Sequence, residues 1–451
     1  MAESAAGNGE HHRRFLRTRL VCSLSAALLT VLGPTNASAL ELQSVARAAQ
    51  AFRSPNQKLE TMYRAALLDT SRQATLAPDG TAYVKTGDIP AEWLRDASAQ
   101  VRPYLFFAKS DPEVASLLRG IIARQAKYLQ IDPYANAFTF NYRVWEQKFE
   151  LDSLAYPVIL AWSYWKTTGD KSIFTSDFSV AMDKVLDTMG REQDHPRNSR
   201  YTHRELSLGG KGQPVKYTGM IWSGFRPSDD ACQLNYLIPS EMMAVVALSD
   251  LMQIERDGFG DAVKARRVKV LRDDVQRGIQ TFGLVLRPGY GYVYAYEVDG
   301  LGNAILTDDA NVPSLLSAPY LGYVRPDDRF YKNTRRFLLS KDNPTFFSGQ
   351  LARGIGSYHT ADGWVWPLAL VMQGMTASTQ TEQRDVLTEI LASDSGDHLL
   401  HEAFNPSDPT MFTRPDFGWP NALFSEYVMT AFQGTPSLPL GDVTDLAFKG
   451  Q

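Results

Sequence analysis

The feature that most restricts the fold of this chain is a long series of helix-forming runs of two kinds. Some are apolar on all sides, such as "SLAYPVILAWSYW" (153–165), and others are amphipathic and charged, such as "DAVKARRVKVLRDDVQRGIQTF" (261–282). A helix that is apolar all round is buried, whereas a helix with one polar face meets solvent. Counted from residue 55, the runs number twelve and the two kinds roughly alternate. We therefore predict an all-α (α/α)6 barrel of six inner and six outer helices; an irregular helical bundle fits the same periodicity.

The helix ends are marked by caps in two of the runs. Ser54 and Asp111 each precede a proline, which suits an N-cap followed by proline at the first helical position. Strand signal is sparse: "YGYVYAYEVDGLGN" predicts a hairpin near 290–305, and "TLAPDGTAYVKTGD" (75–88) predicts a second one. The predicted helices are 55–70, 92–109 interrupted by Pro103, 112–129, 150–168, 173–192, 239–256, 260–282, 309–322, 327–340, 362–376, 380–393 and 418–433.

Residues 1–39 have the order of a secretory signal peptide. A basic stretch, "HHRRFLRTR", precedes a short apolar run and ends at Ala37-Ser38-Ala39. The run is too short for a stable membrane anchor, and Arg13-Arg14 followed by Phe15-Leu16 resembles a twin-arginine export signal. An uncleaved anchor or a basic tail is the alternative. We expect a cleaved signal, an exported periplasmic or secreted protein, and no membrane association afterwards.

The remaining residues, 40–451, are expected to form one domain, since no linker or low-complexity tract divides them. Removing four Arg and two Glu with the signal takes the net charge from −4 to −6, which argues against a nucleic-acid partner. Cys232 is then the only cysteine, so an internal disulfide is excluded.

The unusual polar and aromatic residues lie in loops that precede apolar helices. If those helices form the inner ring, their N-terminal loops meet at one mouth, and the residues there are candidates for a binding site. These candidates are Trp93, Arg95, Asp96, Arg226, Asp229, Asp230, Asp309, Asn311, His359, Trp364, Glu402 and Arg414.

A mouth rich in carboxylates and tryptophans favours carbohydrate chemistry. Trp faces stack on sugar rings, and hydrolysis of a glycosidic bond needs two carboxyl groups, which Asp229 or Asp230 and Glu402 supply from different loops. From spacing alone, helix capping is the more common role for such an Asp pair, and Glu402 also fits a solvated loop acid. Five His remain after residue 39 without an H-E-x-x-H pattern, so no metal site and no cofactor are expected.

Several long motifs resemble those of glycoside hydrolase family 125, the metal-independent exo-α-1,6-mannosidases. They include "TGDIPAEWLRDASAQVRPYL" (86–105), "WSGFRPSDDAC" (222–232), "DDANVPSLLSAPYLGY" (308–323) and "HEAFNP" (401–406), and the resemblance extends from about residue 56 to 433. It implies an (α/α)6 barrel and metal-free hydrolysis with inversion. The chain departs from the usual pattern at Glu92, where an apolar residue is common, and at Tyr358, where proline is common; Tyr358 could alter the binding wall.

The resemblance also implies residue roles. The general acid is an aspartate of "RPSDDA", either Asp229 or Asp230, and the general base is Glu402, with the two carboxyl groups roughly 6.5–9.5 Å apart. Arg95 and Asp96 hold the terminal mannose and Trp93 forms a wall; a buried pair that only ties a helix end is the alternative. The expected partner is a mannose-containing oligosaccharide or N-glycan fragment. A glucoamylase- or trehalase-like glycosidase and a non-catalytic glycan-binding protein are the rival functions.

Overall fold

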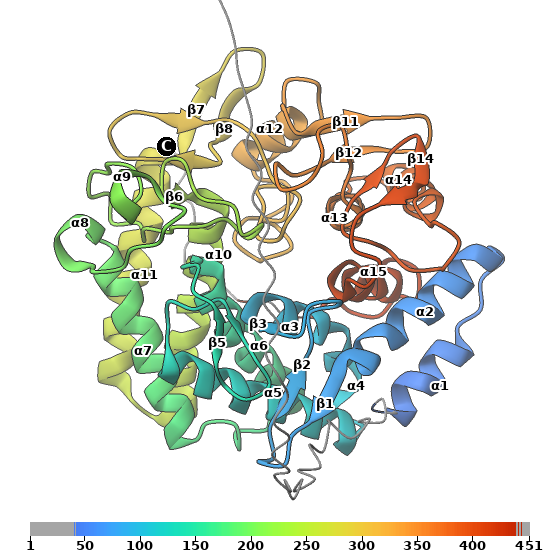
Figure 1. Ribbon diagram of the computed structural model, residues 1–451, viewed down its shortest axis with the longest axis horizontal. Coiled ribbons are helices and arrows are strands. Elements are labelled where there is room, and N and C mark those ends of the chain that lie inside the picture. Colours follow the sequence, from blue (N-terminus) through green and yellow to red (C-terminus); the bar gives the residue numbers. More distant parts are fainter. Residues whose placement is uncertain (1–39, 41, 439–440, 442, 444–451) are drawn as a thin grey trace, which may run out of the picture. The chain divides into compact units, whose positions relative to one another are not determined.

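The inner ring of the fold consists of buried helices. The computed structural model describes residues 40, 42–438, 441 and 443, which belong to one compact unit. Helix α3 packs on α6, α6 on α10, α13 on α15, and α15 returns to α3 (Figure 1). These helices are α3 (Leu94–Gln100), α6 (Leu151–Thr168), α10 (Ile238–Gln253), α13 (Pro367–Met375) and α15 (Gly418–Ala431). Their residues are almost all buried, as all-round apolar helices should be.

The outer ring consists of amphipathic helices that cover the inner ones. Helix α2 packs on α15, α5 on α6, α11 on α10 and α14 on α13, and Figure 1 shows them around the inner helices. These helices are α2 (Gln57–Gln73), α5 (Pro112–Ile131), α7 (Ser176–Glu192), α11 (Ala262–Phe282), α12 (Arg329–Leu338) and α14 (Gln380–Ala392). The architecture is an (α/α)6 barrel, and the predicted fold class is confirmed.

Residues 309–322 form turns, so the helix predicted there is wrong. Pro313 and Pro319 lack an N–H and cannot extend a helical ladder. In addition, the Asp308 carboxylate accepts hydrogen bonds from the Leu315 and Leu316 backbone N–H groups at 2.9 and 3.0 Å. These donors are thereby satisfied by a side chain, and the local hydrogen bonding favours turns over a helix.

The turn segment nevertheless occupies an inner position of the barrel. The Tyr156 hydroxyl of α6 donates a hydrogen bond to the Val312 carbonyl at 2.9 Å, and the Tyr320 hydroxyl donates to Glu426 of α15 at 3.0 Å. The ring is therefore closed between α10 and α13 by residues that are buried without being helical.

Other element boundaries differ locally from the predictions. The 92–109 run divides at Pro103 into α3, a 3-10 turn (Arg102–Tyr104) and α4 (Leu105–Ala108). Helix α2 begins later than predicted because Asn56, rather than Ser54, accepts hydrogen bonds from its first N–H groups. Asp111 caps α5 as predicted. Helix α1 (Gln43–Ala51), α8 (His195–Asn198), α9 (Ser207–Gly210) and a π-turn after α10 (Ile254–Phe259) are additional.

The strands form short antiparallel sheets in the loops between helices. The pairings are β1 (Ala74–Leu76) with β2 (Ala82–Val84); β4 (Ala137–Phe138) with β3 (Glu92–Trp93) and β5 (Val144–Glu146); β9 (Glu297–Val298) with β6 (Tyr236–Leu237) and β10 (Ala304–Ile305); β7 (Leu284–Arg287) with β8 (Gly291–Tyr294); β11 (Phe346–Ser348) with β12 (Arg353–Ile355); and β13 (Phe404–Asn405) with β14 (Asp408–Phe412). The β1–β2 hairpin is confirmed, whereas two hairpins, β7–β8 and β9–β10, replace the single one predicted near 290–305.

The N-terminal prediction concerns residues 1–39, which lie outside the described part of the chain. Within the described part, none of the helices has the length and apolar character needed to cross a membrane.

Candidate active site

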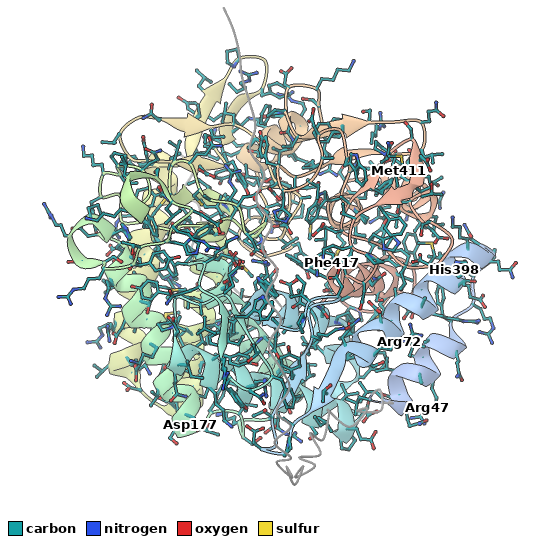
Figure 2. All side chains as sticks on the ribbon, viewed as in Figure 1. Arg47, Arg72, Asp177, His398, Met411 and Phe417 are labelled. Atoms are coloured by element: carbon teal, nitrogen blue, oxygen red, sulfur yellow. The ribbon has the colours of Figure 1, made fainter. Side chains whose placement is uncertain are left out.

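A cavity of about 410 Å³ lies where the N-terminal ends of the inner helices meet. Phe417, which directly precedes α15, is labelled on the side of that helix that faces the centre of the ring in Figure 2. The lining residues are Thr86, Ile89, Trp93, Arg95, Asp96, Pro227, Ser228, Asp229, Asn311, His359, Trp366, Glu402, Thr413, Arg414, Phe417 and Trp419. The volume suits a small-molecule site, and aromatic walls with a few polar groups are typical of such sites.

Asp229 is presented to this cavity by a tight turn. The Asp229 N–H donates to the Arg226 carbonyl at 2.9 Å, and the Arg226 N–H donates to the Asp230 carbonyl at 2.8 Å. Pro227 occupies the second position of the turn, where its fixed φ is favoured. Asp229 follows with a φ of 65°, a left-handed conformation that Asp tolerates better than most residues. The turn thereby separates the two acids and gives them different surroundings.

Arg95 is the central cation beneath the cavity. Its Nη1 lies 2.6 Å from Glu150 and 3.4 Å from Asp152, its Nη2 lies 3.4 Å from Asp229, and its Nε lies 3.3 Å from Asp96. The side chain is 4% exposed, so one guanidinium faces four carboxyl groups with little water present. Removing one partner of a buried charge pair is strongly destabilising, so Arg95 and these four carboxyl groups each depend on the others.

The cluster has strongly shifted ionisation. Burial raises the pKa of Asp96 to about 6 and that of Asp152 to about 6, although Arg95 counteracts both shifts. Burial also raises the pKa of Glu150 well above its ordinary value. For Asp229 the opposing effects of Arg95 and of a hydrogen bond with Glu150 outweigh burial, and its pKa is lowered. Neighbouring acids with opposite shifts are typical of catalytic sites.

Asp230 faces a different partner, His359. Their Oδ1 and Nδ1 atoms are 3.1 Å apart, and this hydrogen bond is the main cause that raises the pKa of His359 to about 9. Hydrogen bonds also hold the backbone of His359. Its backbone N–H donates to the Ser357 hydroxyl at 3.1 Å, and that hydroxyl donates to Asp309 at 2.8 Å. His359 is therefore a cation at neutral pH on the cavity wall.

Glu402 enters the cavity from the loop before the β13–β14 hairpin. Its N–H donates to the Thr413 carbonyl at 3.3 Å, and the Thr413 N–H donates to the Ala403 carbonyl at 2.9 Å. Arg414 follows, with Nη1 3.7 Å from Glu402 and Nη2 2.7 Å from Asp88. Burial raises the pKa of Glu402, and Arg414 opposes that rise.

The cavity collects most of the candidate residues predicted from the sequence. Trp93, Arg95, Asp96, Asp229, Asn311, His359, Glu402 and Arg414 line it. Asp230 adjoins it through His359, and Asp309 accepts hydrogen bonds from the Asn311 side chain at 2.9 Å and from Ser357.

Two of the candidates have structural partners instead of a place in the cavity lining. Arg226 donates to Glu297 at 2.6 Å and is buried, so it ties the Asp229 turn to β9. Trp364 packs against the hydrophobic core, while the lining position belongs to Trp366, whose Nε1 donates to Thr360 at 2.8 Å.

Sequence reasoning missed the acids and the amide that support Asp229. Asn136 Nδ2 lies 2.9 Å from Glu146, 3.3 Å from Glu150 and 3.3 Å from Asp229. Glu150 directly precedes an apolar helix, and this position in the sequence could have identified it as a candidate site residue. In the described residues, no group of three or more His, Cys, Asp or Glu has an arrangement that could hold a metal ion.

A cavity in which two acids from separate loops lie with an Arg–Asp pair between aromatic walls supplies the paired carboxyl groups that glycoside hydrolysis needs. The family described as Metal-independent alpha-mannosidase (GH125) matches residues 56–429. The chain therefore belongs to glycoside hydrolase family 125, and the predicted resemblance is confirmed.

Two individual relatives are similar over most of the chain. The chain is 40% identical over 397 residues to the Meiotically up-regulated gene 157 protein of Schizosaccharomyces pombe (strain 972 / ATCC 24843), covering 79% of this chain and 77% of that protein. It is also similar to a metal-independent alpha mannosidase from Streptococcus pneumoniae, solved as a non-productive substrate complex with alpha-1,6-mannobiose. The TM-score is 0.82 at 40% identity, covering 86% of this chain and 96% of that one.

A bacterial glucoamylase complexed with acarbose shares the fold. Its TM-score is 0.62 at 14% identity, and the match covers 87% of this chain and 58% of that chain.

Proposed function

We propose that the protein is an exo-acting α-1,6-mannosidase that releases the terminal non-reducing mannose of an oligosaccharide or N-glycan fragment. The observation that carries this proposal is that Asp229 and Glu402, from two separate loops, line one cavity together with the Arg95–Asp96 pair. Membership of the α-mannosidase family, and the α-1,6-mannobiose bound by the Streptococcus pneumoniae relative, support mannose as the sugar.

The mechanism we propose is a single displacement with inversion, without a metal ion. Asp229 is the acid that protonates the glycosidic oxygen, and Glu402 is the base that removes a proton from the attacking water. Between the two aspartates we choose Asp229, because it lines the cavity whereas Asp230 pairs with His359. The pKa of Glu402 is raised by burial, but Arg414 and His359 favour its ionised form, which a base requires.

Substrate recognition follows from the remaining lining residues. Arg95 and Asp96 supply charged partners for sugar hydroxyls, and Arg95 is itself placed over the Trp419 ring, 5.5 Å from its centroid. Trp93, Trp366, Phe417 and Trp419 provide apolar faces for the sugar ring. We also propose that residues 1–39 are an export signal, which sequencing of the N-terminus of the exported protein checks.

The test is hydrolysis of α-1,6-mannobiose in EDTA, followed by proton NMR at early times. We expect β-mannose to appear first, and we expect Glu402→Gln and Asp229→Asn to lose turnover by about 10²-fold or more. The matched control is Asp230→Asn, which should retain far more activity than Asp229→Asn.

Other outcomes lead to other functions. Initial release of α-mannose would indicate a retaining mechanism and a carboxylate nucleophile. Cleavage of α-glucosides in place of α-mannosides would favour a glucoamylase-like activity. Binding of mannobiose, measured by calorimetry, without turnover in the unaltered protein would identify a glycan-binding protein.

A further inference from the structure

Arg414 has two carboxylate neighbours at the cavity, and only one of them is the proposed base. Its Nε and Nη2 atoms both donate to Asp88 Oδ1, at 3.0 and 2.7 Å, and Nη2 also donates to the Thr86 carbonyl at 3.1 Å. Glu402 is farther away, since its Oε1 atom lies 3.7 Å from Arg414 Nη1, a separation longer than a hydrogen bond. The guanidinium therefore donates to Asp88, and Glu402 receives only the longer-range attraction of its charge.

The contact between Asp88 and Arg414 is fixed by two loops that approach each other closely. The Asp88 N–H donates to the Asp416 carbonyl at 3.1 Å. Gly87 permits this approach, because a Cβ atom there would lie 1.9 Å from the Asp416 carbonyl oxygen. The Arg414 guanidinium lies over the Phe417 ring, 4.6 Å from its centroid. Backbone and ring contacts therefore hold this pair together, unlike two flexible side chains that meet on a surface.

The three groups differ in how much water surrounds them. The Glu402 side chain is 8% exposed, that of Arg414 is 21% exposed and that of Asp88 is 41% exposed. The remaining charged groups nearby come from α3, from the loops around the cavity and from the two loops themselves. These groups are His359, Asp96, Asp229, Asp230, Lys85 and Asp416. The base is thus the most buried of the three, and water screens Asp88 most.

A base that activates water must remain ionised and yet bind a proton well. An opposite charge within about 4–6 Å lowers the pKa of a carboxyl group by about 1–3 units, and a carboxylate with too low a pKa is a poor base near neutral pH. Burial raises the pKa of Glu402, Arg414 and His359 lower it, and Asp88 adds to the rise. The position of Arg414 between two carboxylates therefore matters for the strength of the base.

We propose that Asp88 is a positioning residue that holds Arg414 away from the base Glu402, so that this base keeps the proton affinity needed to activate water. The inference rests on the proposed function, in which Glu402 removes a proton from the attacking water. Arg414 stays near enough to favour the charged base, while its directed N–H donors are occupied by Asp88. The rival account is that Asp88 keeps Arg414 in place for Glu402. The two accounts predict shifts of opposite sign when Asp88 loses its charge.

The experiment compares the pH profiles of kcat/KM on α-1,6-mannobiose for Asp88→Asn and the unaltered protein. The acidic limb of this profile reports the pKa of the base in the free enzyme. An Asn oxygen still accepts from Arg414, so the variant removes the competing charge and keeps the contact. We expect the acidic limb to move to lower pH by about 0.5–1 unit, a modest shift because the Asp88 side chain is 41% exposed. If the limb moves to higher pH instead, Asp88 only keeps Arg414 in place and the proposal fails.

Three further variants separate charge from loop structure. Asp88→Glu restores the charge and should return the acidic limb towards its original position, and Asp88→Ala, which should also lower the limb, serves if Asp88→Asn does not fold. Lys85→Gln is the matched control, because it removes another ion pair between the same two loops, Lys85 with Asp416 at 3.9 Å. If Lys85→Gln moves the limb as Asp88→Asn does, loop docking is the cause and the proposal is overturned.

The double variant Asp88→Asn/Arg414→Gln tests whether Asp88 acts through the guanidinium. Residues that act through one another have non-additive effects. Asp88→Asn should therefore move the acidic limb much less in the Arg414→Gln background than in the unaltered protein. An equal shift in both backgrounds would mean that Asp88 acts on Glu402 without Arg414, which refutes the proposal.

Glu402→Gln tests the underlying function by itself. If that variant hydrolyses mannobiose normally, Glu402 is not the base and the proposed mechanism is wrong. If Glu402→Gln loses activity while Asp88→Asn leaves the acidic limb unmoved, the base is correct and only the role of Asp88 is refuted.

Discussion

The Asp230–His359 pair offers a direct measurement of charge at the cavity wall. In the folded protein the hydrogen bond to Asp230 is the main cause that raises the pKa of His359 to about 9, against burial, which lowers it. Replacing Asp230 with Asn keeps the shape and a polar partner but removes the negative charge 3.1 Å from the imidazole. The pKa of His359 should therefore fall towards its ordinary value of 6.5.

The size of this fall follows from distance and exposure. Two unit charges about 4 Å apart attract by about 1 kcal/mol in bulk water and about 4 kcal/mol near a protein surface. The two side chains are 38% and 32% exposed, so water screens the pair and the lower part of that range applies. Since about 1.4 kcal/mol corresponds to one pKa unit, the pKa of His359 should fall by about one to two units.

The assay is an NMR titration of the histidine Cε1–H signals in both proteins, with His359→Gln used for assignment. His398, which lies 3.4 Å from Asp394, serves as the internal control for a general change of structure. Because His359 lines the cavity as a cation, kcat/KM of Asp230→Asn should also fall near the new pKa. If the His359 signal still titrates near pH 9 in Asp230→Asn, then Glu402 and Asp229, rather than Asp230, raise the pKa of the imidazole.

Two other perturbations test the base and the turn segment. Arg414→Gln removes the cation 3.7 Å from Glu402, so the pKa of Glu402 should rise. The acidic limb of the kcat/KM profile should therefore move up by about one pH unit. If that limb does not move, Arg414 does not have this role. Asp308→Ala leaves two buried backbone N–H groups without a partner, at a cost of about 1–3 kcal/mol each. Urea denaturation should therefore show that the free energy of unfolding falls by about 2–6 kcal/mol. Asp327→Ala, on the surface, is the control and should change this free energy little. Burial raises the pKa of Asp308 to about 7, and a raised acid loses its stabilising contribution as pH rises through that value, so the loss should be larger at pH 5 than at pH 8.

The ring of helices could be predicted because the spacing of apolar residues along a helix indicates which of its faces are buried. An apolar run such as 151–168 has no polar face to offer solvent, and its position inside follows from that alone. The turn segment 309–322 was not predictable in this way, because its apolar composition fits any buried backbone. What distinguishes it is the side chain of Asp308, which accepts from N–H groups several residues ahead, and composition does not encode that contact.

In the candidate site, too, some residues could be predicted from the sequence and others could not. Glu402 and Arg414 lie within twelve positions of each other, and their loop could be recognised as a unit. Glu150 and Asp229 are far apart in the chain and meet only because α6 and the Asp229 turn reach the same mouth. Neither the left-handed conformation of Asp229 nor the different surroundings of Asp229 and Asp230 can be predicted from two adjacent aspartates.

The placement of charge in this barrel follows from how inner helices begin. Helix α3 starts one residue before Arg95, α6 starts directly after Glu150, and α15 starts one residue before Trp419. A buried helix has a polar end where its first N–H groups lack intrahelical partners, so the mouth of the ring is where polar groups can be buried at least cost. Because the starts of several inner helices converge at the cavity, acids from distant loops come close together there, and this proximity gives them the unequal ionisation that acid and base catalysis requires.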